Sequence, residues 1–429
     1  MKADGTERER VQSASRGAGG PGDTEITSMR PIRETLPLDE ALALIDEAAT
    51  PIARTERVAL RDATGRVVAA AATSAVDVPP FDRAAMDGYA VIAEDTFGAG
   101  RYDPKILRCV EKVYTGEVPT RTLSRGECTE IATGAPMPGG ADAVVMVEES
   151  EKAGDEVRIF TPVYPRQHVG RRAADISAGQ ALLAAGDLLN ASRIGALAAI
   201  GAADVDVYAR PTVAVLSTGN EIVEPGTPLR PGQIYDINHY TITSVVTSHG
   251  GVAIAYPPAP DTLPALVEAI RGAADADIVV FSGGSSVGER DLILDAIQQI
   301  GEVLFHGIAV KPGKPTVFGR VGTTPVFGMP GYPTSCLSNA YMLLVPMLRR
   351  MARLPEYRPH VVRAPLARRV VSTTGRHQFY TVRLENGAAV PAFKASGDIT
   401  SMSLADGYIE IPAQTDIVEA GQMVDVKLF

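Results

Sequence analysis

Between residues 212 and 354, short apolar runs alternate with longer stretches of helical periodicity, and this alternation constrains the fold more than any other feature of the chain. We expect strands at Val213–Ser217, Val252–Tyr256, Ile278–Ser282, Val303–Val310, Thr316–Arg320 and Pro325–Gly328. We expect helices at Asn238–His249, Leu263–Ala274, Leu292–Ile300 and Thr334–Leu354. Strands that alternate with helices of this length predict a doubly wound parallel α/β domain.

Four turns marked by glycine or proline lie at or just beyond the ends of these apolar runs, at residues 216–221, 282–291, 311–315 and 328–335. In an open parallel sheet, ligands bind at the carboxyl edge of the strands. Loops that are far apart in the sequence are therefore expected to converge on one pocket. Their exposed N–H groups, hydroxyls and two lysines are the chemistry of an anion-binding site.

The 282–288 turn contains three glycines and three serines, and it connects an expected strand to the helix that begins at Leu292. Glycines let the backbone approach a phosphate, and N–H groups at a helix start attract an anion. We therefore favour phosphate binding over an ordinary tight turn, although the loop lacks the Gly-Lys-Ser/Thr ending of a Walker sequence. The candidate residues are Ser282, Gly283, Gly284, Ser285, Ser286 and Gly288.

Three carboxylates, Glu221, Asp261 and Asp291, stand at three expected strand–helix junctions. Together with phosphate oxygens they could hold a divalent cation such as Mg²⁺, which typically takes only one or two protein carboxylates. The competing interpretation is structural, because an aspartate that opens a helix often serves as its N-cap. The spacing alone leaves both interpretations open.

Lys311 and Lys314 flank Pro312 and Gly313, and Pro315 follows. Two prolines stiffen this loop, so we expect two ammonium groups on one side of it. Such an arrangement is unfavourable unless an anion is bound, and we favour anion binding over two solvated lysines.

The flanking regions have a different character. Residues 1–29 are polar and glycine-rich and are predicted to be a disordered tail, whereas residues 57–160 and 359–429 contain short strands and turns typical of β domains. Asp87-Gly88 taken alone is a common hairpin turn.

Composition excludes several classes of function. The net charge of −10 disfavours a nucleic-acid-binding surface, and the apolar stretches are too short for a membrane span. Residues 1–30 are polar and lack the apolar region of a secretion signal. The three widely spaced cysteines form no zinc or disulfide pattern and fit a reducing cytoplasm.

Several further segments extend the pattern along the chain. They are residues 78–90 (Val-Pro-Pro-Phe-Asp-Arg-Ala-Ala-Met-Asp-Gly-Tyr-Ala), 131–138, 174–179, 232–238 and 394–412. With the four loops and in this order, they resemble the molybdopterin molybdenumtransferase family, known as MoeA in bacteria and as the gephyrin E domain in animals. The resemblance extends over nearly the whole chain from about Pro31.

The resemblance implies a multidomain α/β plus β architecture. An elongated domain (30–77 and 170–210) is split around an inserted β domain (78–169). An α/β molybdopterin-binding domain (211–358) and a C-terminal β-barrel-like domain (359–429) follow. It also implies an elongated homodimer with a cleft shared between subunits.

The implied reaction uses adenylylated molybdopterin and molybdate, requires Mg²⁺, and yields molybdenum cofactor and AMP. The molybdopterin adenylyltransferase, which makes the adenylylated substrate, is an implied partner. The family's functional positions correspond here to Asp87, Thr133, Asp175, Glu221, Asp261, Asp291, Lys311, Pro330, Pro333 and Ser335. We add Lys314 as a candidate for molybdate attraction, together with Lys311 and Ser335.

Three positions depart from the family pattern, namely Gly307 in place of a frequent lysine, Asn220 in place of aspartate and Tyr332 in place of asparagine. Loss of a cation at Gly307 predicts weaker molybdate binding. A tungstate-using paralogue and a non-catalytic scaffold are the alternatives within the family. Adenylylation of molybdopterin is a third reading, disfavoured because that enzyme resembles the α/β domain alone.

Overall fold

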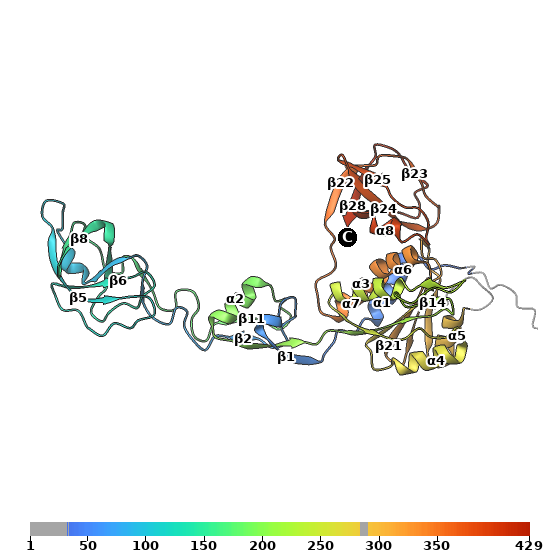
Figure 1. Cartoon of the computed structure of the whole chain (residues 1–429), viewed down its shortest axis with the longest axis horizontal. Coiled ribbons are helices and arrows are strands. Elements are labelled where there is room, and N and C mark those ends of the chain that lie inside the picture. Colours follow the sequence, from blue (N-terminus) through green and yellow to red (C-terminus); the bar gives the residue numbers. More distant parts are fainter. Residues whose placement is uncertain (1–31, 33, 284–290) are drawn as a thin grey trace, which may run out of the picture.

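The computed structural model describes residue 32, residues 34–283 and residues 291–429. The molecule is elongated, with a β domain at one end, a slender neck, and a larger α/β domain with the C-terminal β domain at the other end (Figure 1). The predicted tail 1–29 lies outside the described residues, as do Gly284, Ser285, Ser286 and Gly288 of the phosphate-loop candidates.

The α/β domain is built on a six-stranded sheet in the order β16-β13-β17-β21-β20-β18. Its strands are β13 (Thr212–Ser217), β16 (Val252–Ala255), β17 (Ile278–Ser282), β18 (Glu302–His306), β20 (Val317–Val321) and β21 (Thr324–Met329). The first four strands of that order are parallel, whereas β20 is antiparallel to β21 and to β18. The prediction of a parallel sheet is therefore wrong for β20, whereas the edge strand β18 runs in the same direction as the first four strands. Only Gly322 and Thr323 separate β20 from β21, which is far too short for a parallel crossover.

The expected strand Val303–Val310 is interrupted at Gly307, whose φ of +92° lies in the left-handed region. The chain turns there and continues as β19 (Val310–Lys311), which pairs in parallel with β24 of the C-terminal domain. One predicted strand is thus two strands in two sheets, and Lys311 lies where the α/β and C-terminal domains meet.

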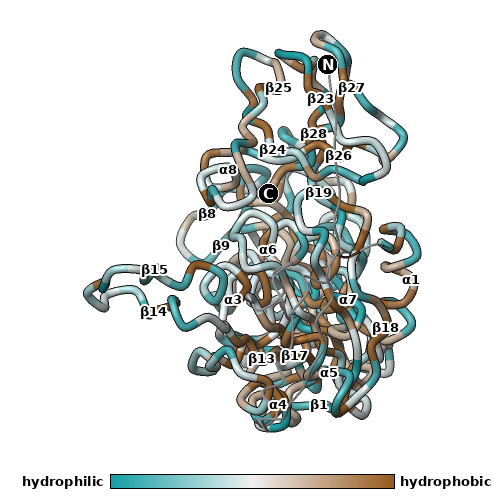
Figure 2. Tube along the Cα trace, turned by 90° about the vertical axis from the view of Figure 1, so that its right-hand side faces the viewer, coloured by the Kyte–Doolittle hydropathy of each residue, from teal (hydrophilic) through white to brown (hydrophobic). Residues whose placement is uncertain are grey.

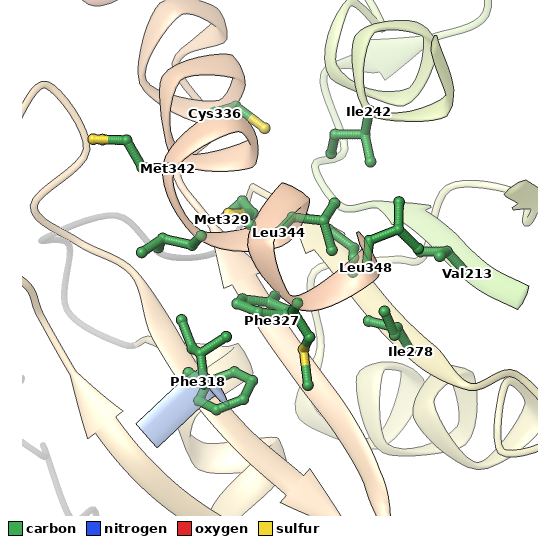
Figure 3. Packing of buried hydrophobic residues seen from close by; sticks show 14 of the residues in the cluster. Val213, Ile242, Ile278, Phe318, Phe327, Met329, Cys336, Met342, Leu344 and Leu348 are labelled. Carbon is green, nitrogen blue, oxygen red and sulfur yellow. The ribbon is translucent and has the colours of Figure 1, made fainter. Parts of the chain in front are cut away.

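Helices cover both faces of the sheet, because successive strand residues point to opposite sides. Val215 and Val280 pack in one core with Phe327, and Leu216 and Phe281 pack in the other. The first core lies beneath α1 (Leu38–Ala48), α3 (Asn238–Ser248), α6 (Pro333–Asn339), η4 (Ala340–Leu344) and α7 (Val345–Met351), as Figure 3 shows in part. The second core lies beneath α4 (Leu263–Gly272) and α5 (Leu292–Ile300).

The predicted helix Thr334–Leu354 is divided into α6, the π-helical turn η4, and α7. Pro346 lies in the first turn of α7 and has no N–H to donate to the preceding turn. A widened π turn before such a position is a common response of the backbone.

Helix α1 belongs to the α/β core rather than to the elongated neck, so the neck is shorter than the predicted range 30–77. Ala41 and Ile45 are buried in the first core. Arg350 of α7 binds the Asp46 carboxylate and the Ala49 carbonyl oxygen. Leu36 forms a bridge with Ile308, so the start of the described chain also lies along this domain.

The neck is formed by two distant segments that run antiparallel. Here β1 (Thr55–Ala59) pairs with β12 (Asp204–Tyr208), and β2 (Ala72–Thr73) pairs with β11 (Ala181–Leu183). Helix α2 (Ala191–Ala199) packs on them and begins at Asn190, whose side chain accepts a hydrogen bond from Arg193 N–H.

The inserted domain is a six-stranded sheet in the order β7-β4-β6-β5-β9-β8. Its strands are β4 (Gly88–Val91), β5 (Lys105–Val113), β6 (Glu127–Ile131), β7 (Ala143–Met146), β8 (Ser150–Ala153) and β9 (Glu156–Ile159). At its base, β3 (Arg83–Ala84) pairs with β10 (Val169–Gly170). The hairpin reading of Asp87-Gly88 is wrong. Gly88 begins β4, a central strand, and a Cβ there would lie 1.9 Å from the Val145 carbonyl oxygen.

The C-terminal domain has its own six-stranded sheet and core. Its elements are β22 (Val361–Pro365), β23 (Val370–Val371), β24 (His377–Glu385), β25 (Ala388–Pro391), α8 (Thr400–Ser403), β26 (Gly407–Ile411), β27 (Ile417–Val418) and β28 (Met423–Leu428). From the α/β domain a narrow arm with β14 (Ile222–Val223) and β15 (Ile234–Tyr235) projects to one side, as Figure 2 shows. Among the described helices, none has the length and apolarity needed to cross a membrane.

Candidate functional site

Three of the four predicted loops leave neighbouring strands at one edge of the α/β sheet. Ser217, Ser282 and Met329 are register partners at the ends of β13, β17 and β21. The hydroxyl oxygens of Ser217 and Ser282 lie 3.2 Å apart and are buried. Gly283 has a φ of +98°, and a Cβ there would lie 2.4 Å from the Thr218 carbonyl oxygen. Backbone from distant parts of the sequence is therefore packed closely at this edge.

Asp261 and Asp291 each have hydrogen-bonding partners at this edge. The Thr218 hydroxyl donates to Asp261 Oδ1. Asp291 Oδ1 accepts a hydrogen bond of 3.2 Å from Leu294 N–H and so caps α5, while its Oδ2 lies 3.0 Å from His306 Nε2. The structural interpretation of Asp291 as an N-cap therefore holds, and His306 is a partner that sequence reasoning missed.

Glu221 folds back over the turn before it. A Cβ on Gly219 would lie 2.8 Å from one of the Glu221 carboxylate oxygens and 2.9 Å from the other. Among the residues that the structure describes, no three acidic, histidine or cysteine side chains are grouped so as to hold a metal ion. Glu221, Asp261 and Asp291 thus do not form a ready-made three-carboxylate site. Mg²⁺ that is bound largely through waters and phosphate oxygens needs only one or two of them, so this donor set fits it.

The lysine loop 311–314 is held rigidly, but its two ammonium groups point to different neighbours. Lys311 Nζ donates to Thr373 Oγ1 of the C-terminal domain at 2.8 Å. Lys314 Nζ donates to the Ile32 carbonyl oxygen at 2.8 Å. The two ammonium groups therefore have different partners, and the expectation that both lie on one side of the loop stays a prediction. The C-terminal domain and the N-terminal segment each take up one lysine.

Asn339, on α6, fixes the turn of this loop, and the sequence analysis did not identify it. Its Nδ2 donates to the Gly313 carbonyl oxygen at 2.9 Å and to Thr316 Oγ1 at 2.6 Å. Thr316 in turn donates to the Gly313 carbonyl oxygen at 2.9 Å. Asn339 is completely buried. A run of polar residues on the inner side of α6 was the signal available in the sequence.

Pro330, Pro333 and Ser335 lie at the entry to α6, beside the C-terminal domain. Pro333 opens α6, and Ser335 is buried within its first turn. The neighbouring Thr334 donates hydrogen bonds to Ser396 O through its N–H and to Asp398 O through its hydroxyl. The C-terminal domain therefore closes over this loop.

Asp87 and Thr133 form a second group, in the inserted domain. Asp87 Oδ1 accepts hydrogen bonds from Thr133 N–H at 2.7 Å and from the Thr133 hydroxyl at 3.0 Å. These bonds hold the pKa of Asp87 below its usual value, the backbone N–H bond contributing most. The carboxylate is therefore ionised at neutral pH.

A hollow of about 230 Å³ adjoins Asp87. Lys112, Tyr114 and Glu130 line it together with β4 and β6. Lys112 and Lys152 both contact the Glu130 carboxylate, and their hydrogen bonds lower the pKa of Glu130. The hollow thus has a fixed, charged wall of both signs.

Asp175 lies exposed at the base of the inserted domain, where its N–H donates to the Val78 carbonyl oxygen at 3.0 Å. The predicted site residues therefore occupy two regions. Asp87 and Thr133 are in the inserted domain, with Asp175 at its base, while the α/β loops are across the neck (Figure 1). Within one chain the structure does not bring these two regions together.

The fold defines a multidomain protein whose α/β domain gathers polar loops at one edge of its sheet, and comparison with known proteins identifies its family. Three family models match in order. They are the MoeA N-terminal region (domain I and II) over residues 36–201, a probable molybdopterin binding domain over residues 214–350, and the MoeA C-terminal region (domain IV) over residues 363–429.

Individual relatives agree with these models. Molybdopterin molybdenumtransferase 2 of Mycobacterium tuberculosis is 36% identical over 380 residues, covering 86% of this chain and 94% of the relative. A putative molybdopterin biosynthesis protein of Methanocaldococcus jannaschii is 31% identical, covering 93% and 100%. The crystal structure of the molybdopterin biosynthesis MoeA protein from Pyrococcus horikosii matches with a TM-score of 0.80 at 42% identity, covering 92% and 99%. The chain belongs to the MoeA family.

Proposed function

We propose that this protein is a molybdopterin molybdenumtransferase, which inserts molybdenum from molybdate into adenylylated molybdopterin and releases AMP. The observation that carries the proposal is the packed edge of β13, β17 and β21, bordered by the lysine loop, in a chain related to molybdenumtransferases over most of its length. Three free cysteines fit a reducing compartment, and we place the reaction in the cytoplasm.

Each described group at this edge has a role in the proposal. The Ser282–Gly283 turn binds phosphate oxygens through its backbone and hydroxyl. Lys311 and Lys314 attract the molybdate dianion, and Ser335 lies at the adjoining entry to α6. The closure of the C-terminal domain over Thr334 would exclude bulk water and strengthen these interactions.

Mg²⁺ would neutralise the phosphoanhydride oxygens when bound, and we assign it to Asp261 and Asp291 with Glu221 nearby. Thr218 and His306 orient the two aspartates through the contacts described above. Asp291 is additionally fixed by its bond to the first turn of α5.

A composite site in a homodimer would unite the two regions. Asp87 and Thr133 are held rigidly in the inserted domain, and the neck separates them from the α/β edge of the same chain (Figure 1). We therefore propose that Asp87 of one subunit faces Lys311 of its partner. Asp87→Asn and Lys311→Ala, each inactive alone, should regain part of the activity when mixed as heterodimers. Full turnover by a strictly monomeric protein would contradict this arrangement.

The test of the function is AMP release by the purified protein from adenylylated molybdopterin, with and without molybdate and Mg²⁺. We expect AMP release that depends on both. Faster release with tungstate would favour the tungstate-using alternative, and no release under any condition would favour a scaffold.

Two further measurements concern the preceding reaction step, the adenylylation of molybdopterin. Consumption of ATP with unmodified molybdopterin would instead place the protein at the adenylylation step. We expect the molybdopterin adenylyltransferase to supply the substrate, so its presence should shorten the lag before AMP appears in a coupled assay.

A further inference from the structure

Two of the three cysteines face each other across neighbouring strands of the inserted domain. Cys109 on β5 and Cys128 on β6 are register partners in a parallel pair. Adjacent strands are about 4.8 Å apart, which is within the range of roughly 4.4–6.8 Å between Cα atoms that a disulfide spans. Both side chains contribute to one core, so they project to the same face of the sheet.

The strand pair has an irregularity at this point. The register of β5 against β6 shifts between Cys109 and Glu111, which is the signature of a β-bulge at Val110. Bulges bend the strand and redirect side chains, and they recur where a side chain needs a special direction. The Cys109 Sγ lies 3.4 Å from the Glu111 carbonyl oxygen, at the bulge itself.

The two sulfur atoms have different surroundings. Cys128 is fully buried, whereas Cys109 is half-buried and can be approached from solvent. A hydrogen bond from the Cys128 thiol lowers the pKa of Cys109 to about 6, with help from the Glu130 N–H and the Lys152 ammonium group. The same bond, together with burial, raises the pKa of Cys128. Ionisation of the pair is therefore favoured at the accessible sulfur of Cys109 rather than at the buried sulfur of Cys128.

We propose that Cys109 and Cys128 are a redox-active pair that a low-molecular-weight disulfide converts reversibly into an intramolecular disulfide. The Cys109 thiolate attacks one sulfur of the oxidant, whose S–S bond breaks and releases one thiolate. Cys128 then loses its proton and attacks the Cys109 sulfur, releasing the second thiolate. Two protein thiols are oxidised by two electrons, and one disulfide molecule is reduced to two thiols.

The buried position of Cys128 suits it to this second step. An external oxidant cannot reach it directly, whereas Cys109 is its immediate neighbour across the strand pair. Its strand β6 ends at Ile131, shortly before Thr133, which holds Asp87. Oxidation would therefore lock the strand that leads into this part of the inserted domain. The chemistry itself is independent of the proposed transferase activity.

The test uses the full-length native protein incubated with glutathione disulfide and then analysed for free thiols and intact mass. We expect the three free thiols to fall to one, with a mass loss of two hydrogen atoms, and recovery of all three after addition of a thiol reductant. Peptide mapping should link Cys109 to Cys128 and leave Cys336 reduced.

Matched variants separate the two steps. Cys128→Ser should stop at a stable glutathione adduct on Cys109, and Cys109→Ser should remain unmodified. Cys336→Ser, a control in the α/β core, should still form the disulfide. The proposal is overturned if the wild-type protein ends as a glutathione adduct with Cys128 free, if Cys336 takes part in the link, or if all three thiols persist under conditions that oxidise the unfolded chain.

Discussion

Replacement of Asn339 by alanine should loosen the loop that carries Lys311 and Lys314, because it removes two hydrogen bonds that hold this loop. The Asn339 amide donates two hydrogen bonds, to the Gly313 carbonyl oxygen and to Thr316 Oγ1, from a completely buried position. Each such bond contributes about 1 kcal/mol, and the space left by the amide costs about 1 kcal/mol more. We therefore expect Asn339→Ala to lower the free energy of unfolding of the α/β domain by about 3 kcal/mol.

The same change should affect the proposed anion site. Among the described side chains, Asn339 and Thr316 donate hydrogen bonds to the Gly313 carbonyl oxygen, and Asn339→Ala leaves only the bond from Thr316. If the loosened loop weakens the free energy of molybdate binding by about 1 kcal/mol, the molybdate concentration for half-maximal turnover should rise about fivefold. Stability is measured by urea unfolding followed by far-ultraviolet circular dichroism, and the anion effect by a molybdate titration at fixed ionic strength.

Asn190 provides a matched control. It is an exposed asparagine that caps α2 in the neck, so Asn190→Ala should cost about 1 kcal/mol and leave the molybdate dependence unchanged. If Asn339→Ala unfolds at the same urea concentration as the wild type and keeps its molybdate dependence, then Asn339 does not hold the loop and the reasoning is refuted. A loss of stability without any change in the molybdate titration would separate the loop from the anion site.

Single-residue changes at Asp291, His249 and Gly307 give three further tests. Asp291→Asn should keep the N-cap of α5, because asparagine caps a helix as well as aspartate does. Turnover should nevertheless fall at least about tenfold, since the charge near the proposed Mg²⁺ is lost. An unchanged kcat in the presence of Mg²⁺ would contradict the metal assignment. Burial, with repulsion from Arg349, lowers the pKa of His249 to about 4, so the native state resists its protonation and stability is lost as the pH falls from the ordinary value of about 6.5 towards 4. From about pH 7 to about pH 5 this loss amounts to about 2 kcal/mol, and urea unfolding of His249→Gln should lack that component. Gly307→Lys should destabilise the protein and fail to improve molybdate binding, because Gly307 has a φ of +92° and a Cβ there would lie 2.5 Å from Ile32 Cγ2. A stable variant that reaches half-maximal turnover at a lower molybdate concentration would contradict this and would show that Ile32 moves aside.

The prediction for Gly307→Lys reverses the expectation from the sequence that a cation is missing at this position. The family resemblance led us to expect a lysine at this position, so the glycine was interpreted as the loss of a cation. In the structure it is the point where β18 ends and the chain crosses to β19 in another sheet. The residue is explained by backbone geometry, which a comparison of side-chain charges does not reveal.

Other parts of the α/β domain were predictable because local and tertiary preferences agree. The predicted strand Ile278–Ser282 and the predicted helix Leu292–Ile300 have the bounds of β17 and α5. An all-apolar run that is buried on both faces has few alternatives, and the helix begins at a capping aspartate. The antiparallel strand was missed because β20 has the same apolar pattern as a parallel strand, and only the short turn between β20 and β21 reveals its direction.

Within the candidate site, the sequence identified groups but not their partners. Thr133 was named beside Asp87 through the family resemblance, and the hydrogen bonds between them became visible only in the structure. Asn339 and His306 were missed for the same physical reason. Each acts through contacts with residues distant in the chain, and no local spacing marks such a contact.

The arrangement of the neck connects these observations to the proposed dimer. Two separately rigid regions can form one site between subunits only if each inserted domain is held at a fixed angle to its own α/β domain. The Arg54 guanidinium, just before β1, binds both carboxylate oxygens of Asp277 at 2.7 Å, and Asp277 also accepts hydrogen bonds from Thr212 N–H and Oγ1. Burial acts to raise the pKa of Asp277, but these hydrogen bonds outweigh it and hold the pKa below its usual value.

A second contact acts at the same junction, where Arg353 stacks over the ring of Tyr208 at 4.1 Å, next to the end of β12. The β1–β12 pair of the neck is thus fastened to the α/β domain at one end, by a bidentate ion pair just before β1 and by a cation–π contact at the last residue of β12. Within one chain the two regions that carry the predicted site residues lie apart (Figure 1). In the proposed dimer, the same two contacts determine the position of Asp87 relative to the partner subunit's lysine loop. The geometry of the proposed site therefore depends on the angle of the neck as well as on the residues that line the site.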